Sequence, residues 1–443
     1  MKFVTLLIAL VFIAEELRRF LKAIWLVRAG GQNDDVSVRA RPLMFMFLFT
    51  WALPLSFVPL NAASLPVQAL RIPPELAMAA PISAEMFCAL LTAALAGWLS
   101  DKAGWQVPAF LGLALSFAGA LASFHASSFE MFVGARALTG LGYGFAWVGI
   151  QALVVGYTAA SVMTFSVANM TAAIFTGHML GTFTGGWLAD WLGFRGVFLF
   201  GAIALAFPAA YVFGFLRIYF RKPLRPLQSQ SGRGVAGIAG LLRNRNFAVL
   251  LLASVIPFSI AQVSLLYYAV PIILNAAGVR TSEIGAVIAL YSAIFVFLAP
   301  LIARRIDTKE QKKNFVVIGG LLGSLALCSL FVIPGLAGVV FSTALLALAA
   351  SIGGAAQTSY ALQLKAVRAA GIGLATGIQR SADKFGQMLG PLVIGAMYTS
   401  AGLTTALALT GAFYLLTTLM FLLVVRPSSA SETATIRKSD GEV

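Results

Sequence analysis

Long apolar runs without a single charged side chain dominate this sequence. A helix of about 20 apolar residues crosses a bilayer, and residues 43–70, 196–216, 247–279 and 284–303 each reach that length without Asp, Glu, Lys or Arg. The charge-free run at residues 137–189 would reach about 80 Å as one helix at 1.5 Å per residue, so it must contain two spans joined by an uncharged turn. Since 60% of the residues are hydrophobic and 11% charged, a water-soluble surface is excluded.

By the same argument, residues 314–364 contain two spans and residues 385–425 about one and a half, and further spans surround Glu85 and Phe110. We therefore predict an all-α polytopic membrane protein with twelve transmembrane helices.

Basic residues are distributed unevenly between the two sets of loops. When the spans are numbered from Leu43, the loops after even-numbered spans carry Lys102, Arg217, Arg221, Lys222, Arg225, Arg233, Arg243, Arg245, Arg304, Arg305, Lys309, Lys312, Lys313, Lys365 and Arg368. The alternate loops carry only Arg71, Arg195 and Arg280. Because cytoplasmic loops are enriched in Lys and Arg, both termini are expected in the cytoplasm, with the chain in a bacterial-type inner membrane. This distribution accounts for the net charge of +15, so no nucleic-acid partner is expected.

The chain is expected to divide into five parts. Residues 1–42 form an N-terminal interfacial or additional helix and a basic cytoplasmic segment, 43–217 a six-helix bundle, 218–245 a basic cytoplasmic linker, 246–425 a second six-helix bundle, and 426–443 a disordered cytoplasmic tail. The first apolar stretch, residues 3–14, would be about 18 Å long as a helix, too short to cross a bilayer. An interfacial amphipathic helix is preferred there, and the remnant of a further span is the alternative.

Two similar nine-residue sequences, which we call the repeated phrases, occur in the first bundle. GWLSDKAGW at residues 97–105 ends span two on the cytoplasmic side, and GWLADWLGF at residues 186–194 ends span five on the outer side. Residues 181–194 also align with residues 390–403, which keeps glycines in register at 181/390, 186/395 and 193/402. These matches predict three-plus-three inverted repeats within two equivalent halves, an organisation that transporters use.

The motifs resemble those of the major facilitator superfamily over residues 43–425. Its signature between spans two and three stands here as Gly97, Leu99, Asp101, Lys102 and Gly104, although Trp105 and Gln106 replace the final basic pair. Its span-four arginine followed by glycines is matched by Arg136, Gly140 and Gly142. Its span-five antiporter signature is matched by Gly177, Gly181, Gly185 and Gly186, with Thr182 in place of the proline. The resemblance implies two six-helix pseudo-symmetric bundles and transport by alternating access.

The resemblance assigns a conformational latch to Gly97, Asp101, Lys102 and Gly104. In that family the aspartate faces the start of span eleven, here near residues 371–374, where a carboxylate interacts favourably with the helix dipole. A generic topological turn is the alternative. The glycines at 177, 181, 185, 186 and 390 are expected to allow close helix packing, either as a rocking surface or as plain contact.

Ionisable residues inside spans are functional candidates because burying them costs about 2.5–3.5 kcal/mol. Candidates for proton coupling or ion pairing are Glu85, Arg136, Arg380, Asp383 and Lys384. Glu85 is interpreted as a proton carrier or as half of a static ion pair with Arg136. The charges of span eleven either face the cavity or neutralise one another.

Solute contact is expected from spans one, four, seven and ten, which line the cavity in the resembling family. The candidates are aromatic or neutral hydrogen-bonding residues: Trp51, Asn61, Tyr143, Trp147, Gln262, Tyr267, Tyr268, Gln357 and Tyr360. They suit an amphipathic organic solute better than a multiply charged anion.

The sequence favours a monomeric secondary transporter that exports a small organic solute by proton antiport. Proton-linked uptake is one alternative, and a transporter-like sensor or membrane module of a larger signalling protein is another. No nucleophile–base pair, nucleotide loop or metal-ligand cluster is recognisable, so neither an enzyme nor a cofactor or metal site is expected.

Overall fold

The computed structural model describes residues 14–19, 21, 36–67, 72–158, 162–220, 234–307 and 312–425. These residues are almost entirely helical. The helices are α2 (Val36–Ala52), α3 (Val58–Ser64), α4 (Pro74–Ala103), α5 (Gln106–His125), α6 (Phe129–Tyr157), α7 (Met163–Ala204), α8 (Ala206–Tyr211), α9 (Gly234–Arg243), α10 (Arg245–Leu250), α11 (Ile256–Val263), α12 (Val270–Ala276), α13 (Thr281–Asp307), α14 (Lys312–Val332), α15 (Gly335–Gln363), α16 (Lys365–Ala370), α17 (Ile372–Ala401) and α18 (Leu403–Val424).

The all-helical membrane fold is confirmed, and the described residues accommodate twelve spans. Ten helical stretches there are long and apolar enough to cross a bilayer. The one at Phe165–Tyr219 contains two spans, because Gly193 has a φ of 69° and breaks the helix. The twelfth span is α17, 30 residues long, which contains Arg380, Asp383 and Lys384 and is therefore less apolar.

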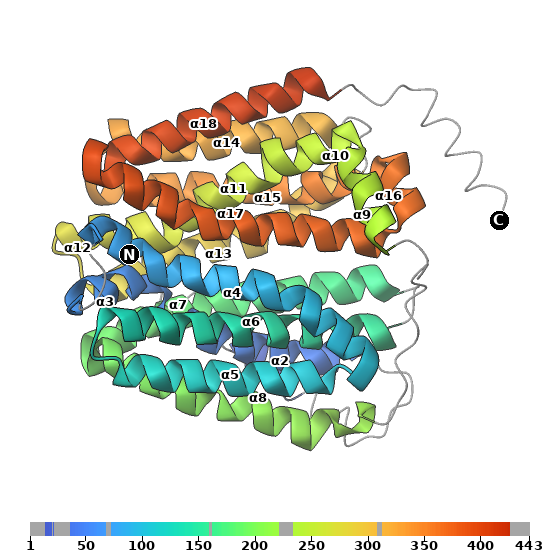
Figure 1. Cartoon of the computed structure of the whole chain (residues 1–443), viewed down its shortest axis with the longest axis horizontal. Helices are drawn as coiled ribbons and strands as arrows, with labels where there is room; N and C mark the ends of the chain where they lie inside the picture. The colour runs from blue at the N-terminus through green and yellow to red at the C-terminus, as the bar shows by residue number, and fades with distance from the viewer. Residues whose placement is uncertain are drawn as a thin grey trace.

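The helices form two bundles that lie one above the other (Figure 1). Helices α2 to α8 form the lower, blue-to-green bundle, and α10 to α18 form the upper one, with α13 and α12 lying next to the lower bundle. The bundles meet where α4 packs against α17 and α7 against α13. We call the end that carries α9 and α16 the linker end, and the end that carries α3 and α12 the opposite end (Figure 1).

Equivalent glycines make equivalent contacts in the two bundles. A Cβ added at Gly181 would clash with the carbonyl oxygen of Phe49 in α2, and one at Gly390 would lie 2.8 Å from that of Ile260 in α11. Gly186 packs likewise against the first turn of α13, and Gly395 against the first turn of α4. These paired contacts are what the pseudo-symmetry predicted from the 181/390 and 186/395 alignment requires.

The repeated phrases do mark helix ends. Gly104 and Gly193 both have positive φ, at 86° and 69°, and the aligned Gly402 has a φ of 80°. Glycine adopts this conformation without the steric cost that a Cβ imposes.

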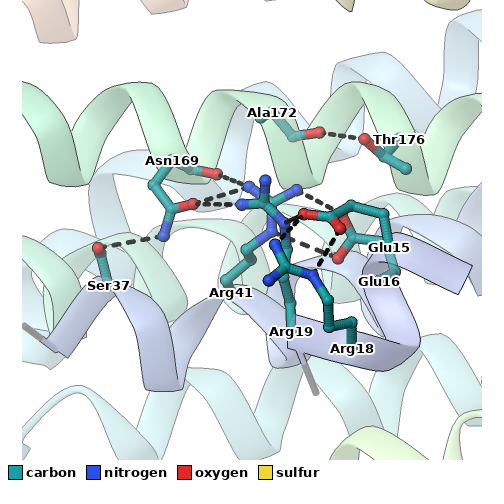
Figure 2. Close-up of polar contacts among 9 residues, drawn as sticks. All are labelled: Glu15, Glu16, Arg18, Arg19, Ser37, Arg41, Asn169, Ala172 and Thr176. Atoms are coloured by element: carbon teal, nitrogen blue, oxygen red, sulfur yellow. Dashed lines mark hydrogen bonds and ion pairs between the residues drawn. The ribbon is translucent and has the colours of Figure 1, made fainter. Parts of the chain in front are cut away.

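The first span begins at Val36, before Leu43, and includes two buried arginines. Arg41 is 4% exposed and forms an ion pair with Glu16, which lies in the short helical stretch at residues 14–19 (Figure 2). Arg41 also donates to the side chain of Asn169 on α7 at 2.8 Å, and Asn169 donates to Ser37 at 3.2 Å (Figure 2). The chain before α2 is thus attached to α2 and α7 at the linker end. Most of the predicted N-terminal helix, much of the linker and the tail lie outside the described residues.

Candidate functional site

A buried ion pair lies at the centre of the first bundle. Glu85 on α4 and Arg136 on α6 are 1% and 2% exposed and form a salt bridge. The indole nitrogen of Trp51 on α2 donates to Glu85 at 2.6 Å. Gly140, one turn after Arg136, leaves room for the backbone of Glu85, because a Cβ there would clash with the Glu85 carbonyl oxygen. A charge at this depth needs a partner, so the pair and its indole donor stabilise one another.

Aromatic rings surround this pair. The ring of Tyr143 lies 4.7 Å from that of Trp51 and 5.5 Å from that of Trp147. The ring of His178, from α7, lies 5.0 Å from Trp51 on another side. Its Nδ1 is 3.3 Å from the hydroxyl of Tyr267, which belongs to the second bundle. The aromatic cluster therefore reaches across the interface between the bundles.

The second bundle contributes three polar residues of α17. The ammonium of Lys384 lies 4.6 Å from the centroid of the Tyr143 ring and 3.9 Å from the sulfur of Met86 on α4. Gln387 accepts from Lys384 at 2.8 Å and donates to Asp383 at 3.1 Å, so its amide bridges the two charges. Asp383 also accepts from Ser259 of α11 at 2.5 Å. Trp51 and Tyr143 thus connect Glu85 of the first bundle with Lys384 of the second.

Nearby, Gln262 donates to the hydroxyl of Tyr291 on α13 at 2.6 Å. Four residues of the site were not among the sequence candidates: Met86, Ser259, Tyr291 and Gln387. Gln387 could have been found by helical spacing, since it lies three and four residues from Lys384 and Asp383. The other three residues belong to different spans, so no local pattern identifies them.

Four sequence candidates lie away from this centre, and a fifth, Arg380, lies at its edge. Tyr268 donates to the backbone of Glu75 at 2.7 Å near the opposite end. Gln357 donates to Ser254 at 2.9 Å inside the second bundle. In the same bundle the ring centroids of Tyr360 and Phe421 are 5.8 Å apart. Asn61 is buried in α3, and Arg380 is exposed one turn before Lys384.

The two repeated phrases make different contacts. In the described residues Asp101 is exposed and forms neither a hydrogen bond nor an ion pair, and Lys102 lies 4.4 Å over the ring of Trp98. Asp190, at the same position of the second phrase, accepts from the backbone N–H of Ser282 at 3.3 Å and lies 3.2 Å from Arg280. These contacts join the end of a first-bundle span to the first turn of α13.

Helices α4 and α17, from the two bundles, are in contact at the opposite end and apart at the linker end. A Cβ on Gly395 would lie 3.2 Å from Cβ of Ala79, which joins α17 to α4 near the opposite end. Gly377 on α17 and Gly97 on α4 each lie about 18 residues, or five helical turns, from this contact towards the linker end. They therefore lie on the same helix faces as Gly395 and Ala79. Neither Gly377 nor Gly97 has a neighbour within 4 Å of its Cβ position. The two helices therefore diverge towards the linker end.

Within the described residues, no group of three His, Cys, Asp or Glu side chains could hold a metal ion.

The sequence and the fold both match known proteins. The sequence profile of the Major Facilitator Superfamily matches residues 42–372 and 258–441, whereas no curated protein sequence matches the chain. Among solved structures, a D-xylose–proton symporter superposes with a TM-score of 0.70 at 17% identity, covering 89% of this chain and 98% of that chain. A POT family transporter in complex with a thioalcohol-conjugated peptide gives 0.69 at 14% identity, covering 87% and 95%.

The human organic anion transporter MFSD10 gives a TM-score of 0.60 at 18% identity, covering 88% of this chain and all of that one. At these identities the neighbours establish the fold, and their different solutes show that the fold alone does not identify a cargo. The profile match spans most of the chain, so the chain belongs to the major facilitator superfamily of membrane transporters.

Proposed function

We propose that this protein is a proton-coupled secondary transporter that exports a small amphipathic organic solute by alternating access. One observation carries the proposal: ionisable side chains from both bundles meet one aromatic cluster at the interface, since Lys384 lies over the ring of Tyr143 and Tyr143 packs on Trp51, the donor to Glu85. A site shared between two bundles changes its exposure when they rock, which alternating access requires. Because one chain supplies both bundles, a monomer contains the whole site.

Glu85 is proposed as the proton carrier. Protonation would remove its charge and weaken its attraction to Arg136, so the two protonation states of Glu85 bind the arginine differently. A proton can bias the equilibrium between two conformations only through such a difference. Solute bound beside Trp51 and Tyr143 would act on the same pair, which couples the two fluxes.

The linker end is proposed to face the cytoplasm, since the basic loops gather there and cytoplasmic loops are enriched in Lys and Arg. Both termini would then be cytoplasmic, in a bacterial-type inner membrane. With the bundles apart at that end, the described conformation corresponds to an inward-facing state. In the outward-facing state Asp101, with Gly97, Lys102 and Gly104, would latch the linker end against the start of α17.

Proton-linked uptake is the second candidate, and the likeness of fold to a D-xylose–proton symporter supports it. Liposomes that contain the protein and a trapped pH-sensitive dye distinguish the two. With solute added outside, antiport moves protons outward and makes the lumen alkaline, whereas symport makes it acidic. A panel of neutral, anionic and cationic organic solutes supplies the test compounds.

Glu85→Gln should abolish solute-driven proton movement while solute exchange between equal concentrations persists. Thr171→Ala, at a threonine that is exposed on α7 and hydrogen-bonds only within its own helix, is the matched control. Proton movement that is unchanged in Glu85→Gln would remove Glu85 from the coupling mechanism. If no solute of the panel moves protons or exchanges, the transport proposal itself fails.

A further inference from the structure

Lys384 is a charged residue of the interface without an ion-pair partner. Among the described residues, no carboxylate oxygen lies within 4 Å of its ammonium, whereas Arg136 is paired with Glu85. An ammonium has three donors. Gln387 accepts one of them, and the other neighbours are the Tyr143 ring and the sulfur of Met86, which are weak acceptors.

The two carboxylates nearest to Lys384 are already engaged. Glu85 accepts from Arg136 and from the indole of Trp51, and Asp383 accepts from Ser259 and Gln387. Charges inside membrane spans normally pair with one another or with backbone carbonyls, and they mark solute and ion pathways. An unpaired charge at such a position has a free capacity to bind a counter-ion, and we take that as an exception to the usual pairing. Lys384 is such an exception.

We propose that the solute carries a single carboxylate and that Lys384 binds it. Lys384 is partly buried beside the paired Glu85 and Arg136, whereas Arg380, one turn away, is exposed. The partly buried cation accommodates one negative charge, and the nearby Asp383 would repel a second. The rings of Trp51, Tyr143 and Tyr267 provide an aromatic surface for the uncharged part of the solute. This inference rests on the proposed function, because it names the class of solute bound at that same site.

Binding of matched small molecules to the purified protein tests the proposal by isothermal titration calorimetry. The probes are benzoate, the neutral isostere benzamide, the cation benzylamine and the dianion phthalate. The Kd of wild-type protein for benzoate should be at least about tenfold lower than for the other three probes. A tenfold difference in Kd is the effect that we expect from one ion pair. Lys384→Gln should remove that preference and Lys384→Arg should keep it, while Arg304→Gln, at an exposed position in the last turn of α13, should leave it largely unchanged.

Equal binding of benzoate and benzamide, or a preference that survives in Lys384→Gln, would overturn the assignment. The failures of the two proposals are distinguishable. If neutral or cationic solutes drive proton movement in the liposome assay, transport stands and the anion assignment falls.

A second inference rests on a different observation, the contact of Asp190 with the first turn of α13. Its carboxylate lies at the first turn of α13, where it meets an unpaired backbone N–H and the positive end of the helix dipole. Asp101 is its counterpart in the repeated phrase, and α17 is the counterpart of α13. In this conformation Asp190 holds its helix terminus at the closed end, whereas Asp101 is unpaired at the open end.

The latch proposed above for Asp101 would hold the state that is closed at the linker end. We infer that Asp190 is its reciprocal counterpart and stabilises the state that is closed at the opposite end. The aspartate of each repeated phrase then favours one of the two conformations. Breaking one latch should shift the equilibrium towards the state that the other latch holds.

Spin-label distances across each end test the reciprocity, in protein whose Cys88 and Cys328 are replaced. Asp190→Asn should reduce the ratio of the state closed at the opposite end to the state closed at the linker end by roughly two- to fivefold, the range for one carboxylate at a helix terminus. Asp101→Asn should increase that ratio by a similar factor, and Asp190→Glu should behave like wild type. Shifts in the same direction, or no shift in either variant, would overturn the inference.

Discussion

At the scale of single residues, the buried pair of Glu85 and Arg136 makes the clearest prediction about stability. Arg136→Met leaves an uncompensated carboxylate in an apolar interior, which costs about 3–5 kcal/mol. The double variant Glu85→Gln with Arg136→Met removes both charges and should recover most of that loss. Unfolding of the purified single and double variants in detergent measures the difference, and a double variant as unstable as Arg136→Met would contradict it.

The sequence predicted the charged residues of the site, but it did not predict which neutral side chains lie beside them. Charged residues inside apolar spans identified Glu85, Arg136 and Lys384, because a bilayer makes such residues rare. The facing of neutral residues was not predictable. Tyr267 and Tyr268 are adjacent, yet only Tyr267 reaches His178, while Tyr268 contacts Glu75. Both tyrosines reach the first bundle, and helical phase alone does not say which of its residues each one meets.

At the scale of helices, glycine packing predicts opposite effects at two positions of similar sequence context. A Cβ at Gly181 clashes with the backbone of Phe49, whereas nothing lies within 4 Å of a Cβ at Gly134. Gly181→Ala should therefore lower the melting temperature. Gly134→Ala should raise it slightly, since alanine in a helix interior is favoured over glycine by roughly 0.5–1 kcal/mol. A thermal scan of both variants checks the sign, and equal effects would contradict the close contact of α2 with α7.

The short helical stretch at residues 14–19 makes a prediction about pH. Hydrogen bonds from Arg18 and Arg19 lower the pKa of Glu15 to about 2. Because a depressed pKa adds stability above the unfolded value of 4.5 and loses it as pH falls towards 2, this contribution should be constant between pH 8 and 5. Deuterium exchange of residues 14–19 should be unchanged over that range after correction for the intrinsic rate. Protection lost between pH 8 and 6 would contradict the ion pairing.

Most helices were predictable because uncharged length decides which segments cross a bilayer, and the glycine phrases marked where spans end. Two elements were harder to predict. Helix α17 carries charges that Ser259 and Gln387 accommodate, and α2 begins before its arginines because Arg41 is buried against Glu16 and Asn169. These partners lie far apart in sequence, so a local hydropathy pattern cannot reveal them.

At the scale of the whole molecule, the divergence of α4 and α17 predicts which cysteine pairs can be cross-linked. Ala79→Cys with Gly395→Cys places two thiols at the closed end, whereas Gly97→Cys with Gly377→Cys places them on the same faces where the helices are apart. In protein without Cys88 and Cys328, oxidation in the described conformation should join the first pair and not the second. If the bundles rock about the central site, the first disulfide should also stop solute exchange, and a reductant should restore it. Exchange that continues with the first pair fully oxidised would mean that the bundles do not separate at the opposite end during transport, which alternating access cannot accommodate.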